Sequence, residues 1–506
     1  MKIDKPADKS ISGESRHQSI VVAGLCLIAA CRLFLFNAAF PLFNNVDEEA
    51  HFDLVNKYSQ GRVPRRPLEK FDKQSGEFII LYGSPEYNLE PQEFPGGSVP
   101  PPWTDPYAIN SEKFKVLVAW KQRITNHESW SMPSYYMAAG LWTAAGRVLG
   151  ITGGRLLYWI RFLNVPLYVM LVIVSYEIAK ILYRQQDWRR IGLPLLAAFF
   201  PQDCFYAITN DSLSPLISAL SFLMLIQLSL ENKGHIYYLT AGLTVATTFM
   251  IKITNISVLA LLGIVVGLEV VHILRDRQFQ RFWKLVVLLL AVAAPIGIWL
   301  TRSYTVWGSL TGIDEVTRWK GWSPKPLTHI LQHPIFTFDG SVFFLSELIK
   351  TFWRGEFVWH GQRIASPITD TFYVISTAVF FFFSACRTGR TNTPATKKYR
   401  FALRLSLCTI IVSVVVLIAI SIRYDFGRWP YPSRQQPFLT SGRLISGSLV
   451  PFCLIYLDGL HCLLSKIKAR INPLAVLTVL VVMITCTELA LSRDVFSSMY
   501  NWFHLK

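Results

Sequence analysis

Repeated apolar runs of about 20 residues constrain this chain more than any other feature of its sequence. A helix that crosses a membrane needs about 20 mostly apolar residues, whereas a membrane β-barrel needs alternating apolar and polar positions. The runs here are continuous, and only 16% of the 506 residues are charged, against about 25% in a typical soluble domain. The sequence therefore predicts an all-α polytopic membrane protein with about 11 transmembrane helices. The predicted spans are 20–41, 156–183, 191–208, 213–230, 236–251, 254–274, 283–303, 369–386, 401–422, 441–465 and 472–491.

The basic residues set the expected orientation, because cytoplasmic loops of membrane proteins are enriched in Lys and Arg. A weaker run, 132–149, decides which loops share a side. If it does not cross, most basic loops lie together with the N-terminal tail, so we predict that 132–149 is an outer interfacial or half-inserted helix. The net charge of +17 is then explained by topology, which excludes a nucleic-acid partner. The basic loops on the predicted cytoplasmic side are 184–190, 231–235, 275–284, 387–400 and 466–470.

This topology divides the chain into four parts. The second outer loop carries an amphipathic aromatic segment, Glu347 to His360, which is expected to anchor at the interface or to line an acceptor groove. The parts are a cytoplasmic tail (1–19), a membrane module (20–303) with a large first outer loop (42–155), the second outer loop (304–368) and C-terminal membrane helices (369–506).

Acidic residues cluster directly after the first predicted span, at Asp47, Glu48, Glu49 and Asp53, with His51 among them. Carboxylates at a membrane boundary are costly unless they are used or paired. They are compatible with the capped first turn of a helix, where the helix dipole favours acids. They are equally compatible with a general base or a set of metal ligands.

Further polar residues fall on the same predicted face: Asn210, Asp211, Lys252 and Arg443. Asp211 is suited to capping the next helix, and Lys252 to reaching past the membrane surface. Arg443 is suited to bidentate contact with a phosphate. Arg32 lies in the middle of the first span, where a functional role and an ion pair with another helix are both consistent with the sequence.

Six short motifs follow one another along the chain: Val46–Phe52, Met132–Tyr136, Asn210–Leu213, Phe249–Thr254, Phe352–Gly355 and Ser441–Leu444. In this order, the six motifs resemble those of the C-superfamily glycosyltransferases (GT-C fold). Within that superfamily the chain is most similar to bacterial predicted membrane proteins related to the protein mannosyltransferases and lipid A aminoarabinose transferases. The chain departs from the family pattern in Met-Pro-Ser before the tyrosine pair and in Leu444 after Gly-Arg.

The resemblance implies a GT-C-like catalytic membrane module in residues 20–303, in the bacterial inner (plasma) membrane, with an extracytoplasmic active site. It implies an inverting transfer of sugar from a polyprenyl-phosphate donor to a hydroxyl of a glycan, lipid or protein acceptor, among membrane lipids. Asp47 would be the catalytic base, with Glu48 second. A divalent cation is possible, held by Asp47 and Asp211. The donor- or substrate-binding residues would be His51, Asn210, Asp211, Lys252 and Arg443.

Three other functions fit the same layout. A transporter or flippase of a lipid-linked glycan shares the many spans, but the chain has no internal repeat of the kind typical of transporters, and its acids gather at the surface. An O-antigen ligase or polymerase uses the same class of donor. A non-catalytic scaffold would keep the fold without the reaction.

Overall fold

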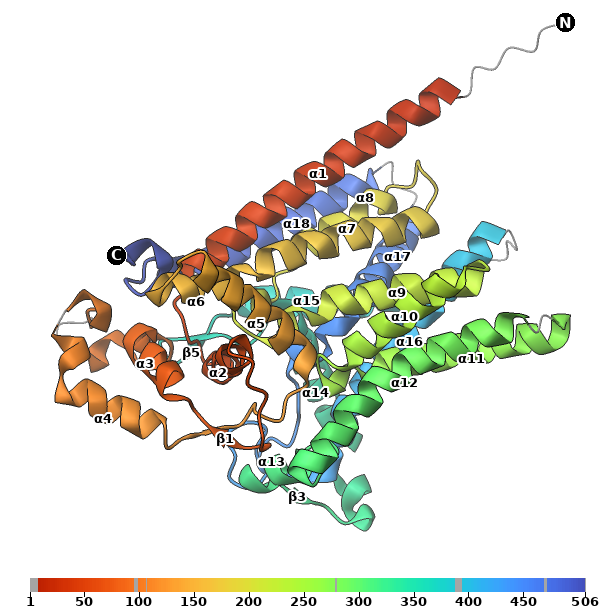
Figure 1. The fold of residues 1–506 in the computed structure, drawn as a ribbon. Coiled ribbons are helices and arrows are strands. Elements are labelled where there is room, and N and C mark those ends of the chain that lie inside the picture. The colour runs from red at the N-terminus through yellow and green to blue at the C-terminus, as the bar shows by residue number, and fades with distance from the viewer. Residues whose placement is uncertain are drawn as a thin grey trace, which may run out of the picture.

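Long helices that lie side by side dominate the computed structural model, and shorter helices cover one end of the bundle (Figure 1). The structure describes residues 8–94, 99–105, 107–277, 280–386, 394–467 and 471–505. The bundle contains α1 (Asp8–Ala39), α6 (Gly153–Phe162), α7 (Asn164–Leu182), α8 (Arg189–Ala198), α9 (Ser214–Leu230), α10 (His235–Phe249), α11 (Ser257–Asp276), α12 (Gln280–Trp307), α15 (Pro367–Ala385), α16 (Pro394–Arg423), α17 (Leu449–Ile467) and α18 (Pro473–Leu491).

Within the described residues, nine helical stretches are long and apolar enough to cross a membrane, whereas the sequence predicts eleven. The runs 191–208 and 236–251 account for the difference. The first forms α8 of 10 residues, because the chain leaves the helix before Pro201 and continues through the 3₁₀ turn Asp203–Tyr206. The second forms α10 of 15 residues, which packs along α9 and α12. The nine stretches are His17–Ala39, Gly153–Leu182, Asn210–Leu230, Ile253–Arg275, Gln280–Trp307, Pro367–Ala385, Lys397–Arg423, Gly442–Ile467 and Pro473–Leu491.

Two pairs of the segments predicted to share the cytoplasmic side contact each other in the structure. Gln18 donates to the carbonyl of Gln185 at 2.6 Å, and Lys284 donates to Asn232 at 2.7 Å. This arrangement agrees with the predicted grouping of basic loops, while the side of the membrane they face stays a prediction. Part of the basic set lies outside the described residues, namely Lys2, Lys5, Arg387, Arg390, Lys468 and Arg470.

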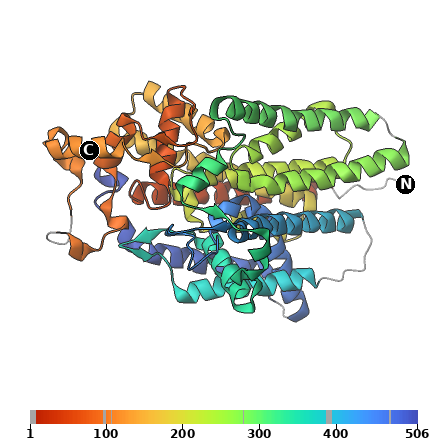
Figure 2. The same cartoon turned by 90° about the horizontal axis from the view of Figure 1, so that it is seen from below.

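The first outer loop forms a layer of short helices at the opposite end from the basic loops, as Figure 2 shows for the red and orange segments. Its α5 coincides with the weak run 132–149 and is not among the nine stretches. Leu141 and Val148 on its outer face are 73% and 87% exposed, while Tyr136 is buried. An exposed apolar face suits the predicted interfacial position. The helices of this layer are α2 (Glu48–Ser59), α3 (Lys73–Tyr82), α4 (Glu112–Lys121) and α5 (Pro133–Val148).

Three two-residue antiparallel strand pairs tie the outer segments together. They pair Glu69 with Asn126, Ser323 with Asp425, and Val358 with Arg363. The second pair joins the second outer loop to the segment that precedes α17. The strands are β1 (Glu69–Lys70), β2 (Thr125–Asn126), β3 (Ser323–Pro324), β4 (Val358–Trp359), β5 (Gln362–Arg363) and β6 (Tyr424–Asp425).

The second outer loop contains α13 (Ile313–Trp319) and α14 (Phe338–Arg354), and a short α19 (Arg493–Phe496) follows α18. The sequence predicts that the aromatic segment of α14 anchors at the interface or lines a groove, but Trp353 is fully buried. Its ring stacks between Phe200 and Tyr373, with centroids 4.7 and 4.9 Å away. The aromatic residue at position 353 therefore forms core, because burying its large apolar surface stabilises the contact of α14 with α15.

Arg32 forms an ion pair inside the bundle, one of the two roles that the sequence left open. Its Nη2 atom lies 2.5 Å from Glu488 of α18 and 2.6 Å from the Tyr206 hydroxyl. The Arg32 and Glu488 side chains are 6% and 9% exposed. A charged side chain that is buried this deeply requires a partner of opposite charge.

Candidate functional site

The loop after α1 carries Asp47 to the site, and buried Glu48 fixes that loop. The Glu48 carboxylate accepts hydrogen bonds from the backbone N–H groups of Phe43 at 2.9 Å and Ile208 at 2.8 Å. Arg161 of α6 donates three further hydrogen bonds to it, at 2.6 to 3.0 Å, and both side chains are fully buried. Glu48 therefore holds the Asp47 loop against the chain before α9, and we assign it a structural role in place of the catalytic one expected from the sequence.

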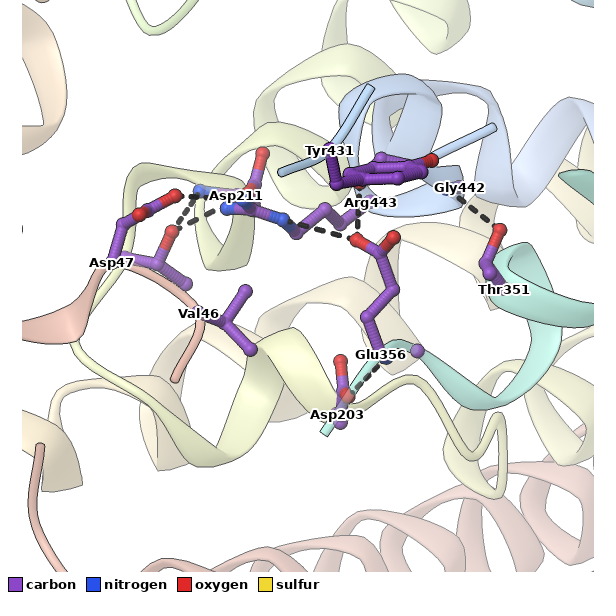
Figure 3. A network of polar contacts seen from close by, with 12 residues as sticks. Val46, Asp47, Asp203, Asp211, Thr351, Glu356, Tyr431, Gly442 and Arg443 are labelled. Atoms are coloured by element: carbon purple, nitrogen blue, oxygen red, sulfur yellow. Dashed lines mark hydrogen bonds and ion pairs between the residues drawn. The ribbon is translucent and has the colours of Figure 1, made fainter. Parts of the chain in front are cut away.

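Arg443 is the centre of a network that joins three carboxylates from distant parts of the chain (Figure 3). Its guanidinium lies 2.9 Å from Asp47 Oδ2, 3.2 Å from Asp211 Oδ2 and 3.4 Å from Glu356 Oε2. Lys252 Nζ lies 2.7 Å from the other oxygen of Asp211. The Asp211 side chain is fully buried, whereas 35% of the Asp47 side chain is exposed. Asp47 is thus the most accessible of the three carboxylates.

Each charged residue of this network lies next to the end of a helix. All of them are at the end of the bundle that the short helices cover. Backbone groups at helix ends lack partners within the helix, and side chains satisfy several of them here. Thr209 accepts from the N–H of Asp211 at 3.3 Å, and Ser446 donates to its carbonyl at 3.2 Å. The positions are Asp47 before α2, Asp211 in the 3₁₀ turn Asn210–Ser212 before α9, Lys252 after α10 and Arg443 in the 3₁₀ segment Gly442–Ser448 before α17.

Arg443 reaches the network because α14 packs directly against Gly442, the residue before Arg443. A Cβ atom on Gly442 would lie 2.1 Å from the backbone nitrogen of Phe352, so glycine is required there. The N–H of Gly442 donates to Thr351 Oγ1 at 2.9 Å (Figure 3). The glycine of the Ser-Gly-Arg motif thus permits the close approach of α14 to the site.

Glu356 and Asp203 belong to the site although the sequence analysis did not single them out. Glu356 pairs with Arg443 and accepts a hydrogen bond from Ser441. Asp203 accepts hydrogen bonds from the backbone N–H groups of Glu356 and Phe357, at 2.6 and 2.8 Å. Two sequence signals pointed to them: Glu356 directly follows the Phe-Trp-Arg-Gly motif, and Asp203 is an isolated carboxylate in an apolar run.

A histidine that the sequence analysis also missed binds the other side of Asp47. His127 Nε2 lies 3.2 Å from Asp47 Oδ1. Burial acts to lower the pKa of His127, but the hydrogen bond to Asp47 and the charge of Asp47 raise it above its ordinary value. Burial acts to raise the pKa of Asp47, but the hydrogen bond from His127 and the charge of Arg443 hold it well below its ordinary value. Asp47 is therefore ionised at neutral pH.

Asp47, His127 and Glu128 could together hold a divalent cation, because one ligand atom from each lies within 4.8 Å of the others. Carboxylate oxygens and an imidazole nitrogen suit metals such as Zn²⁺ and Mn²⁺. The sequence suggested a cation between Asp47 and Asp211, but the structure places the guanidinium of Arg443 between those two carboxylates. Any cation site among these residues is therefore shifted toward the first outer loop.

His51 and Asn210 line the buried wall beside the network. His51 Nδ1 lies 2.7 Å from the Tyr136 hydroxyl, and Asn210 Nδ2 lies 3.5 Å from the same oxygen. Burial lowers the pKa of His51, which leaves its imidazole uncharged at neutral pH. Among the described residues, Asn210 Oδ1 has no hydrogen-bond partner. The structure thus places all the predicted binding residues around Asp47. Glu48, the second predicted catalytic residue, is instead paired with Arg161.

These features define an integral, multi-pass helical membrane protein with a charged site at one end of its bundle, under a layer of short helices. The chain belongs to the family described as predicted membrane protein (DUF2142), whose profile matches residues 32–428. That range contains Asp47, Asp211 and Glu356 and ends before Arg443. A search of curated proteins finds no significant match.

Among solved structures, the chain is similar to an archaeal oligosaccharyltransferase from Archaeoglobus fulgidus. One such structure, AglB in complex with an inhibitory peptide and a dolichol-phosphate, is 12% identical with a TM-score of 0.39 over 96% of this chain. The apo form gives 12% identity and a TM-score of 0.43 over 96% of this chain. The form with Zn and sulfate gives 13% and 0.39 over 94%. This chain spans 53 to 56% of the length of those proteins. The function proposed below is argued from the residues of the site.

Proposed function

We propose that the protein is a GT-C-like glycosyltransferase that moves a sugar from a polyprenyl phosphate to an acceptor hydroxyl at the extracytoplasmic face of a bacterial plasma membrane. The observation that carries the proposal is the Arg443 network. It brings an accessible carboxylate, Asp47, and two cations, Arg443 and Lys252, to one end of a membrane bundle. Transfer from a lipid phosphate needs both elements, a base for the acceptor and positive charge for the leaving phosphate.

The reaction is a single displacement with inversion at the anomeric carbon. The acceptor oxygen forms a bond to that carbon as the bond from the carbon to the phosphate oxygen breaks. Asp47 takes the hydroxyl proton, and the polyprenyl phosphate leaves with the electron pair. A phosphate is already a good leaving group, so the step requires no strong general acid.

Asp47 suits the role of base by its position and its ionised state. Of the three carboxylates that contact Arg443, it has the largest exposed fraction, 35%, and so it is the one that an acceptor can reach. Its pKa is held well below the ordinary value, so it accepts the proton only as the new bond forms. Positioned base catalysis of this kind contributes about 10² to 10⁴ in rate.

Arg443 and Lys252 are proposed to bind the donor phosphate. Charge-assisted hydrogen bonds to phosphate are strong in a site shielded from water, and these side chains are only 14% and 17% exposed. In this arrangement Asp211 orients both cations, because it contacts each of them. Asn210 and His51 are proposed to form the wall beside the donor, which they share through their contacts with the Tyr136 hydroxyl.

A cation at Asp47, His127 and Glu128 would add positive charge beside the phosphate and stabilise the charge that develops as the phosphate leaves. Activity before and after treatment with a chelator measures that contribution. If Asp47 bound a cation, His127 would contribute a neutral imidazole, so binding would release a proton at pH values where His127 is charged.

A transporter or flippase, or an O-antigen ligase or polymerase, remains the alternative. Arg32, the charged residue found in the middle of the first span, is paired with Glu488, whereas the Arg443 network lies at the end of the bundle. That location favours chemistry at the membrane surface over passage through it. A ligase or polymerase would use the same donor class and differ in its acceptor.

Donor binding by purified variants tests the proposal. We expect Arg443→Ala to weaken affinity for a polyprenyl-phosphate sugar by at least 10-fold, and Arg443→Lys by less, because Lys retains the charge and loses only the bidentate fork. Lys252→Ala should act in the same direction. Arg434→Ala is the matched control, because Arg434 is exposed in the segment between β6 and α17 and pairs with Asp425. Equal affinity in the Arg443→Ala, Lys252→Ala and control variants would contradict the proposal.

A further inference from the structure

Asp203 lies next to Glu356 of the Arg443 network, in the 3₁₀ turn Asp203–Tyr206 that follows α8. Its side chain is buried, and its Oδ2 atom accepts the backbone N–H groups of Glu356 and Phe357 at 2.6 and 2.8 Å (Figure 3). Its other oxygen, Oδ1, has no hydrogen-bond partner among the described residues. A buried carboxylate with one unpartnered oxygen is costly, so its presence requires an explanation beyond packing.

The carboxylate of Asp203 occupies the space that a side chain at position 355 would need. Gly355 has φ of +85°, and a Cβ atom there would lie 1.8 Å from Asp203 Cγ. On the other side of the same turn, Arg354 donates to the carbonyl of Gly355 at 2.8 Å and pairs with Asp370 at 2.7 Å. The turn of the Phe-Trp-Arg-Gly motif is thus fixed from two sides.

This turn determines where Glu356 points. With its backbone N–H bound to Asp203, Glu356 directs its carboxylate to Arg443 Nε at 3.4 Å and accepts a hydrogen bond from Ser441. Glu356 is therefore the third carboxylate that orients the guanidinium, beside Asp47 and Asp211.

We infer that Asp203 is a positioning residue for the donor-phosphate site: it holds the Gly355 turn so that Glu356 aligns Arg443. This inference rests on the proposed function for its substrate and on the structure for its geometry. It gives the Phe-Trp-Arg-Gly motif a role that the proposed reaction alone does not explain.

The surroundings of Asp203 make its ionisation relevant at neutral pH. Burial raises the pKa of Asp203 to about 7, although the hydrogen bonds from Phe357 and Glu356 oppose that shift. Ionised Asp203 makes charge-assisted hydrogen bonds to the turn, and protonation weakens them. A cavity of about 40 Å³ adjoins Asp203. The charged and titratable groups that face Asp203 are Glu356, Arg443, Arg354 and Cys204, together with Tyr206, Asp370, Tyr373 and Glu488 of the cavity.

A double-mutant cycle tests the inference in the full-length protein. Asp203→Ala and Glu356→Ala should each lower kcat/KM for a polyprenyl-phosphate sugar by about 10-fold or more. The double variant should be no worse than Glu356→Ala alone, because residues that act through one contact are non-additive. Losses that multiply in the double variant would overturn the inference.

A second variant separates positioning from simple loss of structure. The amide oxygen of Asp203→Asn can still accept both N–H groups, so this variant should fold and lose less activity than Asp203→Ala. Because its amide does not titrate, its pH–rate profile should show a smaller inflection near pH 7 than that of wild type. Asp425→Asn, in the outer segment, should keep the inflection. An unchanged inflection in Asp203→Asn would contradict the role of Asp203.

The same cycle is also measured by thermal unfolding, which needs no substrate. If the wild-type protein transferred no sugar, the proposed function would fail, while coupling between positions 203 and 356 in melting temperature would still support the hold on the turn. Additive shifts in melting temperature would contradict that hold whatever the outcome of the activity assay.

Discussion

Asp47 and Glu48 are adjacent in sequence but point into different surroundings. Asp47 has φ of +61°, a left-handed conformation that turns the chain between them. The Asp47 side chain reaches the Arg443 network, and the Glu48 side chain reaches Arg161 in the core. The Asp47 carboxylate is thus partly exposed in the network, and the Glu48 carboxylate fixes the loop that carries Asp47.

The first prediction follows from the burial of Glu48. Breaking a buried ion pair by removing one partner's charge costs about 3 to 5 kcal/mol, so Glu48→Gln should lower the melting temperature markedly. Glu112→Gln is the control, because Glu112 and Lys115 are 85% and 61% exposed in their pair, and such pairs are worth about 0 to 1 kcal/mol. Equal melting temperatures for the two variants would show that the Glu48 pair does not hold the loop.

The second prediction concerns the pH dependence of stability at Asp203. Its pKa is about 7 in the folded protein, against 3.8 ordinarily, so the folded state binds more protons between these values. The free energy of unfolding therefore falls as pH rises from about 4 to 7, by at most about 4 kcal/mol. Asp203→Asn removes this cost, so its melting temperature relative to wild type should increase from pH 5 to pH 8. A constant difference across that range would contradict the raised pKa.

Sequence reasoning identified four members of the network, Asp47, Asp211, Lys252 and Arg443, because each is a charge beside a predicted span on one face. It missed His127, Glu356 and Asp203. His127 and Glu356 lie in long outer loops, where sequence position does not reveal which residues meet. Asp203 lies where the sequence predicts an uninterrupted span, and only the fold shows that the chain turns there. The catalytic and binding roles of these residues stay predictions.

At the scale of elements, periodicity and run length predicted the long helices well and the short ones poorly. An apolar composition is shared by helices that span and by shorter buried segments, so α8 and α10 were both expected to be full spans. The sequence also could not predict which elements α14 packs against. Tryptophan occurs both at membrane interfaces and in protein cores, and the structure places Trp353 in the core.

The third prediction concerns the contact between α14 and the segment that carries Arg443. A Cβ atom at position 442 has no room, so Gly442→Ala should displace α14, destabilise the protein by more than about 1 kcal/mol and weaken donor binding. Gly263→Ala in α11 is the control, because nothing lies within 4 Å of its added Cβ atom. Alanine there should be neutral or stabilising. A Gly442→Ala variant as stable and active as the control would contradict the close approach of α14.

The whole molecule is polarised, with basic loops at one end of the bundle and the Arg443 network at the other. The membrane orientation that follows is the fourth prediction. Single cysteines at Gln186 and Lys397 should escape an impermeant reagent in intact cells, and one at Leu331, which is 80% exposed, should react. The background needs all eight native cysteines removed. Strong labelling at position 186 or 397 would place the network on the cytoplasmic side.

The most direct measurement for the proposed function is sugar transfer by Asp47→Asn. The amide is nearly isosteric with the carboxylate but cannot take the proton of the acceptor. The account predicts that this variant folds and binds the polyprenyl-phosphate sugar, yet transfers the sugar at least about 10²-fold more slowly than wild type. Asp314→Asn, an exposed acid in the second outer loop, should retain full activity. Turnover by Asp47→Asn close to that of the Asp314→Asn control, at matched melting temperature, would contradict the account.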